Sequence, residues 1–558
     1  MFVRVNKTPN SPRKSIQVVE SKREKDKVKT KILRHVGIAM DDDEVEKLRQ
    51  LGHDIIAKLT QEREESSGQL RLFDEGQAPL QPKRGRKPLK KLEDIVPVEQ
   101  LTLDQIQEEK RIIEGIGEVG GHLFETFGFD QLLKSKKDTQ LLKDLTLSRL
   151  VFPSSKHKLH QLLADKFHKN YPLEQIYRLM DKLHPLIGML KAKVFNRSQQ
   201  LFPKDGVDLM FFDVTTLYFE SQEKDALRDF GYSKDFRFNT TQVVLALATN
   251  ADGLPVGYEL FPGKTAEVTT LIAAIENWNT LFEIKNVCFV GDRAMFCEKN
   301  LALLAAKKYT YIVAAKLRSL NKNTQEALFN LENYRLQAFG DELGWVGEFP
   351  HQGRRLIVSY KRKRALRDQR KRQEILEKIE KGIAKSKGVK AGITNAGLKK
   401  YTTCTGQATL ALDMEKIAQD EQWDGMHGVI TNVDDLGAVE ILQRYKRLWV
   451  IEDAFRINKH DLKIRPIYHF KPERIETHVA MCYMSFALMK HLHYTVALTQ
   501  KLSVGKLIEE LLDVQASIYV HKTTRDRYRV PGRMSDNARK IYKAFNLQRS
   551  QHADIYLN

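Results

Sequence analysis

The stretch from residue 207 to 315 constrains the fold most, because strand and helix patterns follow one another along it in a definite order. It begins with "VDLMFFDVTTLYFE", whose β-branched and aromatic residues predict a strand. A hairpin around the turn "ADGLP" follows, then a helix, a short apolar strand, a second helix and a further strand. Three strands, helix, strand, helix and strand predict an α/β fold, a mixed sheet with helices on its faces.

Two aspartates occupy notable positions in these strands. Asp213 lies in a strand otherwise too apolar to face water, and the period of two places it on one face with Leu209 and Phe211. Asp292 follows "VCFV", at the carboxyl end of a strand, which is the usual site position in open α/β sheets. An aspartate at a strand end also serves as a helix cap. Each residue alone therefore leaves a structural and a functional interpretation open.

A third carboxylate lies in "WVIEDAFRINK", which reads as a helix. Tyr445, Glu452 and Lys459 are spaced by seven residues, and a seven-residue step drifts by only about 20° around a helix. The spacing predicts one stripe along a single helix. The alternative is a surface helix with an ordinary ion pair between Glu452 and Arg456, four residues apart.

Two strand aspartates followed by a helical glutamate form a set of three carboxylates. Carboxylate oxygens are the ligands that Mg²⁺ prefers, and Mn²⁺ is expected to substitute. Two such ions, about 4 Å apart, activate the attacking oxygen and stabilise the leaving oxygen in phosphoryl transfer. This combination favours phosphoryl transfer more strongly than any single residue does.

The chain resembles the bacterial insertion-sequence transposases of the DDE class that carry a Y-R-E-K signature and an insertion in a ribonuclease-H-like core. Six pieces carry the resemblance, in the expected order, between roughly residues 207 and 470: "FFDVTTLYFE", "GYSKDFRFNTTQV", "GLPVGYELFPGKTAE", "FVGDRAMF", "TNVDD" and "YKRLWVIEDAFRINKHDLKIRPIYH". The resemblance implies that Asp213, Asp292 and Glu452 are the catalytic metal ligands. It implies that Tyr445 and Lys459 hold the phosphates of the transposon end.

The sequence departs from the signature at its arginine, because Leu448 occupies that position. Arg447 lies about 140° around an ideal helix from Glu452, whereas Arg456 lies only about 40° away. We therefore expect Arg456 to be nearer to Glu452, and both arginines are candidates for DNA binding.

The charge of the chain points to a polyanionic partner. Its 92 Lys and Arg exceed 72 Asp and Glu, which gives a net charge of +20. Arg84 and Arg86 lie in "RGRKP", which resembles the extended arm that AT-hook peptides place in a minor groove. The alternative is a flexible charged linker.

Three tryptophans are considered for stacking on an unpaired base: Trp345, Trp423 and Trp449. We expect Trp449 to anchor its helix in the core instead. Trp423 is kept as a DNA-binding candidate beside a structural role in the core. A histidine of the core is the expected role of His478.

No apolar run approaches the roughly 18 residues that span a bilayer, and Val479 to Met489 predicts a buried helix. The four cysteines show no CxxC pairing, so we expect a reducing cytoplasm and no structural zinc. These features predict a cytoplasmic protein without a membrane segment, and the family resemblance implies a bacterial host and association with the nucleoid.

The expected function is a DNA transposase that binds element ends, cleaves them by metal-dependent hydrolysis and joins the 3′ hydroxyl to target DNA by cut and paste. Its partner is double-stranded DNA, held by a homodimer. The alternatives are a ribonuclease-H-like nuclease without joining and a transposase-derived DNA-binding protein without catalysis. We expect these domains: a small β-rich DNA-binding region at 1–75, a basic linker at 76–95, a helical region at 96–200, the core at 201–317 and 426–500, a basic insertion at 318–425 and a C-terminal helical region at 501–558.

Overall fold

The computed structural model divides the chain into two compact units, residues 1–91 and residues 92–558. It describes residues 2–7, 14–24, 27–39, 41–56 except 43, 47 and 54, 97–98, 101–201, 208–231, 239–282, 287–292, 295–340, 342–385, 400–405 and 409–556.

The first unit is an antiparallel sheet in the order β1-β2-β3, formed by β1 (Phe2–Lys7), β2 (Lys14–Glu24) and β3 (Lys27–Ala39). Ile16, Val18 and Val19 of β2 are buried. Helical residues follow between 42 and 56. The described part of residues 1–75 is therefore three strands followed by helical residues, in keeping with the β-rich character expected of this region.

The second unit is built around a mixed sheet whose elements follow the predicted order. They are β5 (Asp208–Tyr218), β6 (Gln242–Asn250), β7 (Pro255–Pro262), α7 (Glu267–Leu281), β8 (Val287–Gly291), α8 (Glu298–Ala306) and β9 (Thr310–Ala314). β5, β8 and β9 run parallel, while β6 and β7 form the antiparallel hairpin. This mixed α/β arrangement is consistent with a ribonuclease-H-like fold.

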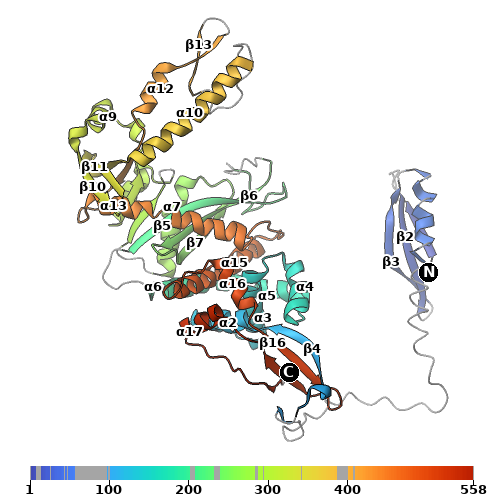
Figure 1. Ribbon diagram of the computed structural model, residues 1–558. Coiled ribbons are helices and arrows are strands. Elements are labelled where there is room, and N and C mark those ends of the chain that lie inside the picture. The colour runs from blue at the N-terminus through green and yellow to red at the C-terminus, as the bar shows by residue number, and fades with distance from the viewer. Residues whose placement is uncertain are drawn as a thin grey trace, which may run out of the picture. The chain divides into compact units, whose positions relative to one another are not determined.

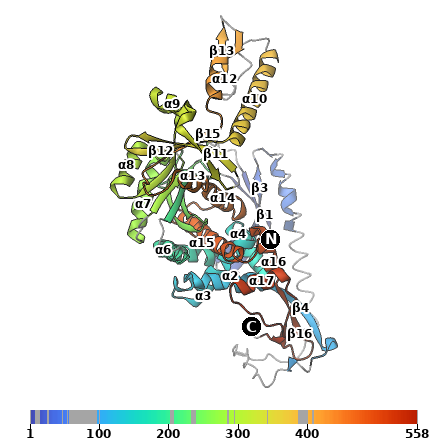
Figure 2. The ribbon, with the colours of Figure 1, turned by 60° about the vertical axis from the view of Figure 1, so that its left-hand side comes forward.

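The basic segment between β9 and residue 426 extends this sheet. The strand order is β10-β11-β12-β15-β9-β8-β5-β6-β7, where the added strands are β10 (Tyr334–Phe339), β11 (Glu342–His351), β12 (Arg354–Tyr360) and β15 (Met426–Thr431). Helix α10 (Arg362–Lys385) begins at the second residue of the basic run "KRKRALRDQRKR". Both ribbon views show α10, α12 (Met414–Glu421) and β13 (Thr402–Thr405) projecting from one end of the sheet (Figures 1 and 2).

The two faces of the sheet belong to different hydrophobic clusters, as period-two alternation requires. Leu209 and Phe211 of β5 pack in a cluster with helices α2 to α6, α14 and α15, whereas Met210 and Phe212 pack against α7 and α8 on the opposite face. The face predicted for Asp213 is therefore the face with α14 (Trp449–Arg456).

Several helices cover this first face. They are α2 (Gly115–Thr126), α3 (Lys136–Val151), α4 (Lys156–Phe167), α5 (Leu173–Leu183), α6 (Ile187–Gln199) and α15 (Pro472–Ala497). The run from Val479 to Met489 is buried within α15, which confirms the predicted core helix. None of the helices in the described residues combines the length and hydropathy that a bilayer crossing requires.

The regions predicted as wholly helical at the two ends of this unit also contain strands. β4 (Ile106–Ile113) includes the start of "KRIIEGIG", and it pairs with β16 (Gln515–His521). With β17 (Arg527–Pro531) and β18 (Asp554–Ile555) they form a four-stranded sheet beside α16 (Val504–Leu512) and α17 (Asp536–Ala544). The helical prediction for these strands is wrong, because a pairing over some 400 residues of sequence decides their conformation rather than local propensity.

Candidate active site

Parallel pairing brings the two candidate aspartates to one edge of the central sheet. The partners of β5 and β8 are 79 residues apart throughout, from Asp208 opposite Val287 to Phe211 opposite Val290. Asp213 and Asp292 are also 79 residues apart, so the same register continued by two residues places them on neighbouring strands. We call this end of β5, β8 and β9 the carboxyl edge.

The backbone holds the Asp213 carboxylate in place, since its Oδ1 accepts a hydrogen bond of 2.7 Å from the N–H of Val214. Asp213 is half-buried, whereas Asp292 is exposed immediately after the last residue of β8. The prediction that Asp292 lies at the carboxyl end of a strand is confirmed.

Glu452 comes from the helix that packs on this face of the sheet. Val450, Ile451, Ala454 and Phe455 of α14 are buried, while Glu452 is exposed in the first turn. Within the described residues its carboxylate makes no hydrogen bond or ion pair, so the predicted alternative, a pair with Arg456, is absent there. Arg456 instead contacts Asp453 at 2.8 Å and Asp461 at 3.1 Å.

The donor chemistry of these three carboxylates suits a divalent cation. Asp213 lies in β5 and Asp292 directly follows the adjacent strand β8, while the carboxylate of Glu452, which has no partner among the described residues, lies on the helix that packs on the face of Asp213. Across the described ranges, however, no three His, Cys, Asp or Glu side chains are grouped closely enough to hold a metal ion.

A family model described as "Transposase DDE domain" matches residues 205–488, just over half of the 558 residues. The chain belongs to this family. The matched stretch contains Asp213, Asp292 and Glu452. A search of the curated proteins finds no match. The family is one of transposases that act on DNA and generally use divalent metal ions.

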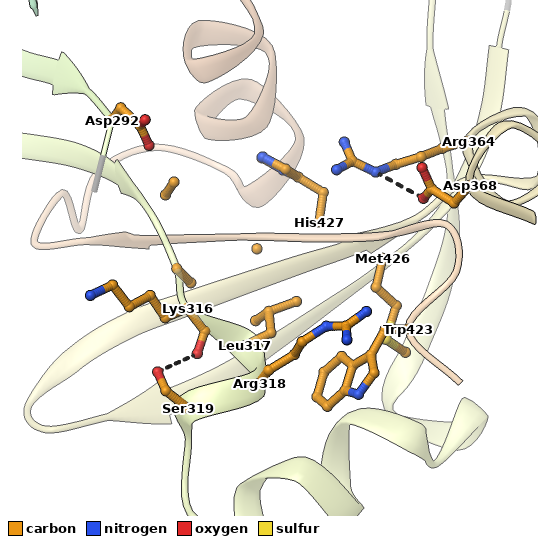
Figure 3. Close-up of a pocket in the computed structure, with 13 residues that line it drawn as sticks. Asp292, Lys316, Leu317, Arg318, Ser319, Arg364, Asp368, Trp423, Met426 and His427 are labelled. Atoms are coloured by element: carbon orange, nitrogen blue, oxygen red, sulfur yellow. Dashed lines mark hydrogen bonds and ion pairs between the residues drawn. The ribbon is translucent and has the colours of Figure 1, made fainter. Parts of the chain in front are cut away.

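A cavity of about 680 Å³ adjoins the carboxyl edge of the DDE domain. Asp292 lines it together with Lys316, Arg318, Arg364 and His427. Figure 3 shows Asp292 at one side of the cavity and Arg364 at the other, with His427 between them. Three cationic side chains thus line a cavity that one candidate metal ligand enters.

The sequence did not indicate four residues that line this cavity with Asp292: Lys316, Arg318, Arg364 and His427. Lys316 lies two residues after β9, which runs parallel to β8, so the rule that singled out Asp292 also applies to it. Lys316 is exposed, and its ammonium forms no ion pair with any residue that the structure describes. Arg364 lies in the basic run of α10, where charge density alone does not indicate which side chain turns inward.

The signature segment, residues 438–461, is not the single helix that the seven-residue spacing predicts. It consists of α13 (Ala438–Lys446), α14 and a π-helical turn (Ile457–Asp461). At the junction, the N–H of Leu448 donates to the carbonyl of Tyr445, and the N–H of Ile451 donates to that of Leu448. These three-residue steps tighten the chain, and the π turn widens it, so the expected 20° drift does not apply.

Tyr445 and Lys459 consequently lie on different pieces of the segment. The ring of Tyr445 packs 5.1 Å from the ring of His427, which lines the cavity beside Asp292. Lys459 is half-buried in the π-helical turn.

The two arginines of the segment have different partners. Nη2 of Arg447 donates to the carbonyl of Ala251 at 2.6 Å and lies 3.3 Å from Asp252, in the β6–β7 turn. The guanidinium of Arg456 is held between two carboxylates, as described above. The angle assigned to Arg447 relied on an uninterrupted helix and loses its basis, whereas Glu452 and Arg456 lie one turn apart within α14.

The tryptophans also differ from expectation. Trp449 is 61% exposed, so the prediction that it anchors its helix in the core is wrong; Val450 and Ile451 do so instead. Trp423 is half-buried, packs edge-to-face on Phe329 at 4.7 Å and lines the cavity beside Asp292. His478 is buried in α15, as expected. Arg84 and Arg86 lie outside the described residues.

Proposed function

We propose that the protein is the transposase of a bacterial insertion sequence with a Y-R-E-K-type signature. It binds the element ends, cleaves them by metal-dependent hydrolysis and joins the released 3′ hydroxyl to target DNA by cut and paste. The observation that supports this proposal is the parallel register of β5 and β8. Continued by two residues, this register sets Asp213 opposite Asp292, on the face of β5 against which α14, the helix of Glu452, packs.

Asp213, Asp292 and Glu452 would hold the metal, Mg²⁺ with Mn²⁺ as a substitute. When bound, such ions activate the attacking oxygen and stabilise the leaving oxygen of the phosphate. The protein contributes the orientation of the carboxylates. The hydrogen bond from Val214 fixes Asp213, and the buried side chains of α14 fix the position of the helix that carries Glu452.

DNA phosphates would be bound along the carboxyl edge. Lys316 supplies an exposed ammonium beside Asp292, and Arg364 approaches from the inserted segment. Tyr445 and Lys459 would contact the phosphates of the cleaved end, and Trp423 would stack on a base at the cavity wall. The insertion at 318–425 and the linker at 76–95 would add further basic residues for contacts to DNA phosphates.

Both ends of an element must be held together for joining, so we propose a homodimer on DNA, associated with the bacterial nucleoid. The two alternatives predict different products. A nuclease of this fold would release ends without joining them, and a DNA-binding derivative would do neither.

A strand-transfer assay tests the proposal. A labelled duplex carrying the terminal sequence of the native element is incubated with supercoiled plasmid and Mg²⁺, Mn²⁺ or EDTA. We expect cleavage and plasmid-linked label with either metal and no product with EDTA. Cleavage without linked label would support the nuclease, and binding without cleavage in both metals would rule out the catalytic proposal.

A further inference from the structure

A second, smaller cavity lies at the N-terminus of α4 and is lined by hydrogen-bond donors. It has a volume of about 260 Å³ and is bordered by Ser155, Lys156, Tyr177, His469 and His478. These residues come from α4, α5, α15 and the loop that follows the signature segment. The volume is below the range of about 300–1,000 Å³ typical of sites for drug-sized ligands, so it suits a small group.

Lys156 carries a buried ammonium that has no counter-charge among the residues that the structure describes. Its side chain is 3% exposed, and among the described residues no carboxylate pairs with it. Its one hydrogen bond is with Nδ1 of His478, at 3.4 Å. Nε2 of His478 donates to the carbonyl of Ile464 at 3.1 Å, so Nδ1 is the unprotonated nitrogen and accepts from Lys156. Two of the three ammonium N–H groups are left for a ligand.

A second buried cation lies close to Lys156. Arg149 is 2% exposed and donates to the backbone carbonyls of Leu462 and Ser154, at 2.7 and 3.2 Å. Within the described residues it has no carboxylate partner either. Burial, and after it the charge of Arg149, lowers the pKa of Lys156 to about 7. Two buried positive charges without an anion are costly, because transfer from water is compensated only by a partner of opposite charge.

Other donors face the same space. The ring of His469 is buried 5.4 Å from that of His478, and neither its nitrogens nor the Tyr177 hydroxyl make a hydrogen bond in the part of the chain that the structure describes. Ser155 caps α4 by accepting from the N–H of Lys158 at 3.2 Å. The preceding N–H groups, those of Lys156 and His157, have no partner within the helix, as at any helix start.

We infer that this cavity binds a phosphate group. A phosphate anion brings negative charge to Lys156 and Arg149, which lack a carboxylate partner among the described residues. Its oxygens can accept from the ammonium, the His469 ring, the Tyr177 hydroxyl and the start of α4 at once. The inference stands apart from the chemistry proposed for the three carboxylates. The phosphate is either free in solution or part of a DNA backbone, and the two sources are separable.

Thermal unfolding of the full-length protein near pH 6.5 tests binding, with inorganic phosphate compared with chloride at equal ionic strength. We expect phosphate to raise the Tm of the wild type by about 1–3 °C at concentrations well above its Kd. Lys156→Met should abolish this rise. The variant should still fold, with a Tm at or above that of the wild type without phosphate, because an apolar side chain replaces an unpaired buried charge.

Lys158→Met is the matched control, since Lys158 is exposed on the same helix two residues away. It should respond to phosphate as the wild type does. The salt dependence of binding to a DNA duplex then identifies the source. If the cavity takes a backbone phosphate, the slope should fall by about one in Lys156→Met only. If Lys156→Met loses the phosphate response while its slope stays that of the wild type, the ligand is free phosphate.

Three results would overturn the inference. One is a rise in Tm with phosphate that survives Lys156→Met. Another is an equal loss of the phosphate-induced rise in Tm in the Lys158→Met control, which would indicate a general effect of charge. The third is a wild type that shows neither a phosphate response nor a difference in slope between the two variants.

Discussion

The carboxyl edge and the signature segment both carry proposed metal ligands, but they position them by different means. At the edge, two aspartates follow from the register of adjacent parallel strands, which a packed sheet keeps rigid. In the signature segment, a three-residue turn and a π turn interrupt the helix on either side of Glu452. A strand pattern thus predicts directly which side chains lie close together. A spacing of seven residues places side chains on one side only if the helix is unbroken.

The largest expected effect is the loss of chemistry on removing any of the three carboxylates. Asp213→Asn, Asp292→Asn or Glu452→Gln should each slow cleavage and joining by at least roughly a thousandfold, about 4 kcal/mol. End binding should remain, because it depends on Lys and Arg contacts to phosphates. Cleavage assays and gel-shift measurements on the same preparations check both parts.

Glu440→Gln is the matched control, an exposed carboxylate on α13 that pairs with Arg444. It should cleave like the wild type. If Glu452→Gln stayed active while both aspartate variants were inactive, the signature segment would supply no metal ligand, and the comparison of the two regions would fail.

The strand order around Asp213 and Asp292 was predictable because a β-strand has a fixed period and parallel strands end at one edge. The pairing of β4 with β16 was not, since nothing local to Ile106–Ile113 indicates a partner some 400 residues away. The break at Leu448 and the exposure of Trp449 were not predictable either, because both depend on how α13 and α14 meet the sheet. The position of Lys316 was predictable by the same rule, because it follows β9, which runs parallel to β8.

Acid should destabilise the surroundings of the signature segment. Burial, with smaller effects from Arg364 and Lys361, lowers the pKa of His427 to about 4. This value lies below the roughly 6.5 of an unfolded histidine, so the unfolded chain binds more protons between these pH values and stability falls as the pH is lowered. The cost is up to about 3 kcal/mol by pH 4.

Urea unfolding at pH 7.5 and 5.0 measures this effect. His427→Leu should lose less stability on acidification than the wild type, while His460→Leu, exposed in the π turn, should behave as the wild type does. Hydrogen exchange should locate the acid effect in α13, against which His427 packs, rather than in β5 and β8. If the stability of all three proteins depended equally on pH, His427 would not be the group that causes the loss of stability in acid.

The two signature arginines should differ in DNA binding. Arg447 engages its partners through one nitrogen, whereas Arg456 lies between Asp453 and Asp461. Arg447→Ala should therefore weaken binding of a pre-cleaved end by roughly 1.5–3 kcal/mol, about ten- to a hundredfold. Arg456→Ala should lower the Tm with little effect on affinity. If Arg456→Ala weakened binding more than Arg447→Ala, the expectation based on the position of Arg456 one turn from Glu452 would be supported instead.

The smallest expected effect concerns recognition away from both regions. If "RGRKP" lies in a minor groove, changing Arg84 and Arg86 to Ala should weaken binding by about 1 kcal/mol, and more on A·T-rich ends than on G·C-rich duplexes, because the narrow A·T groove attracts arginine most. Lys90→Ala with Lys91→Ala is the control for charge alone.

The affinities of these variants for matched A·T-rich and G·C-rich duplexes decide between the explanations. A loss that is uniform across sequences and equal to that of the lysine control marks a general phosphate contact, and no loss marks a linker. Only a loss of affinity confined to A·T-rich ends would show that the linker recognises DNA sequence. The carboxyl edge and the signature segment would then serve cleavage and phosphate binding.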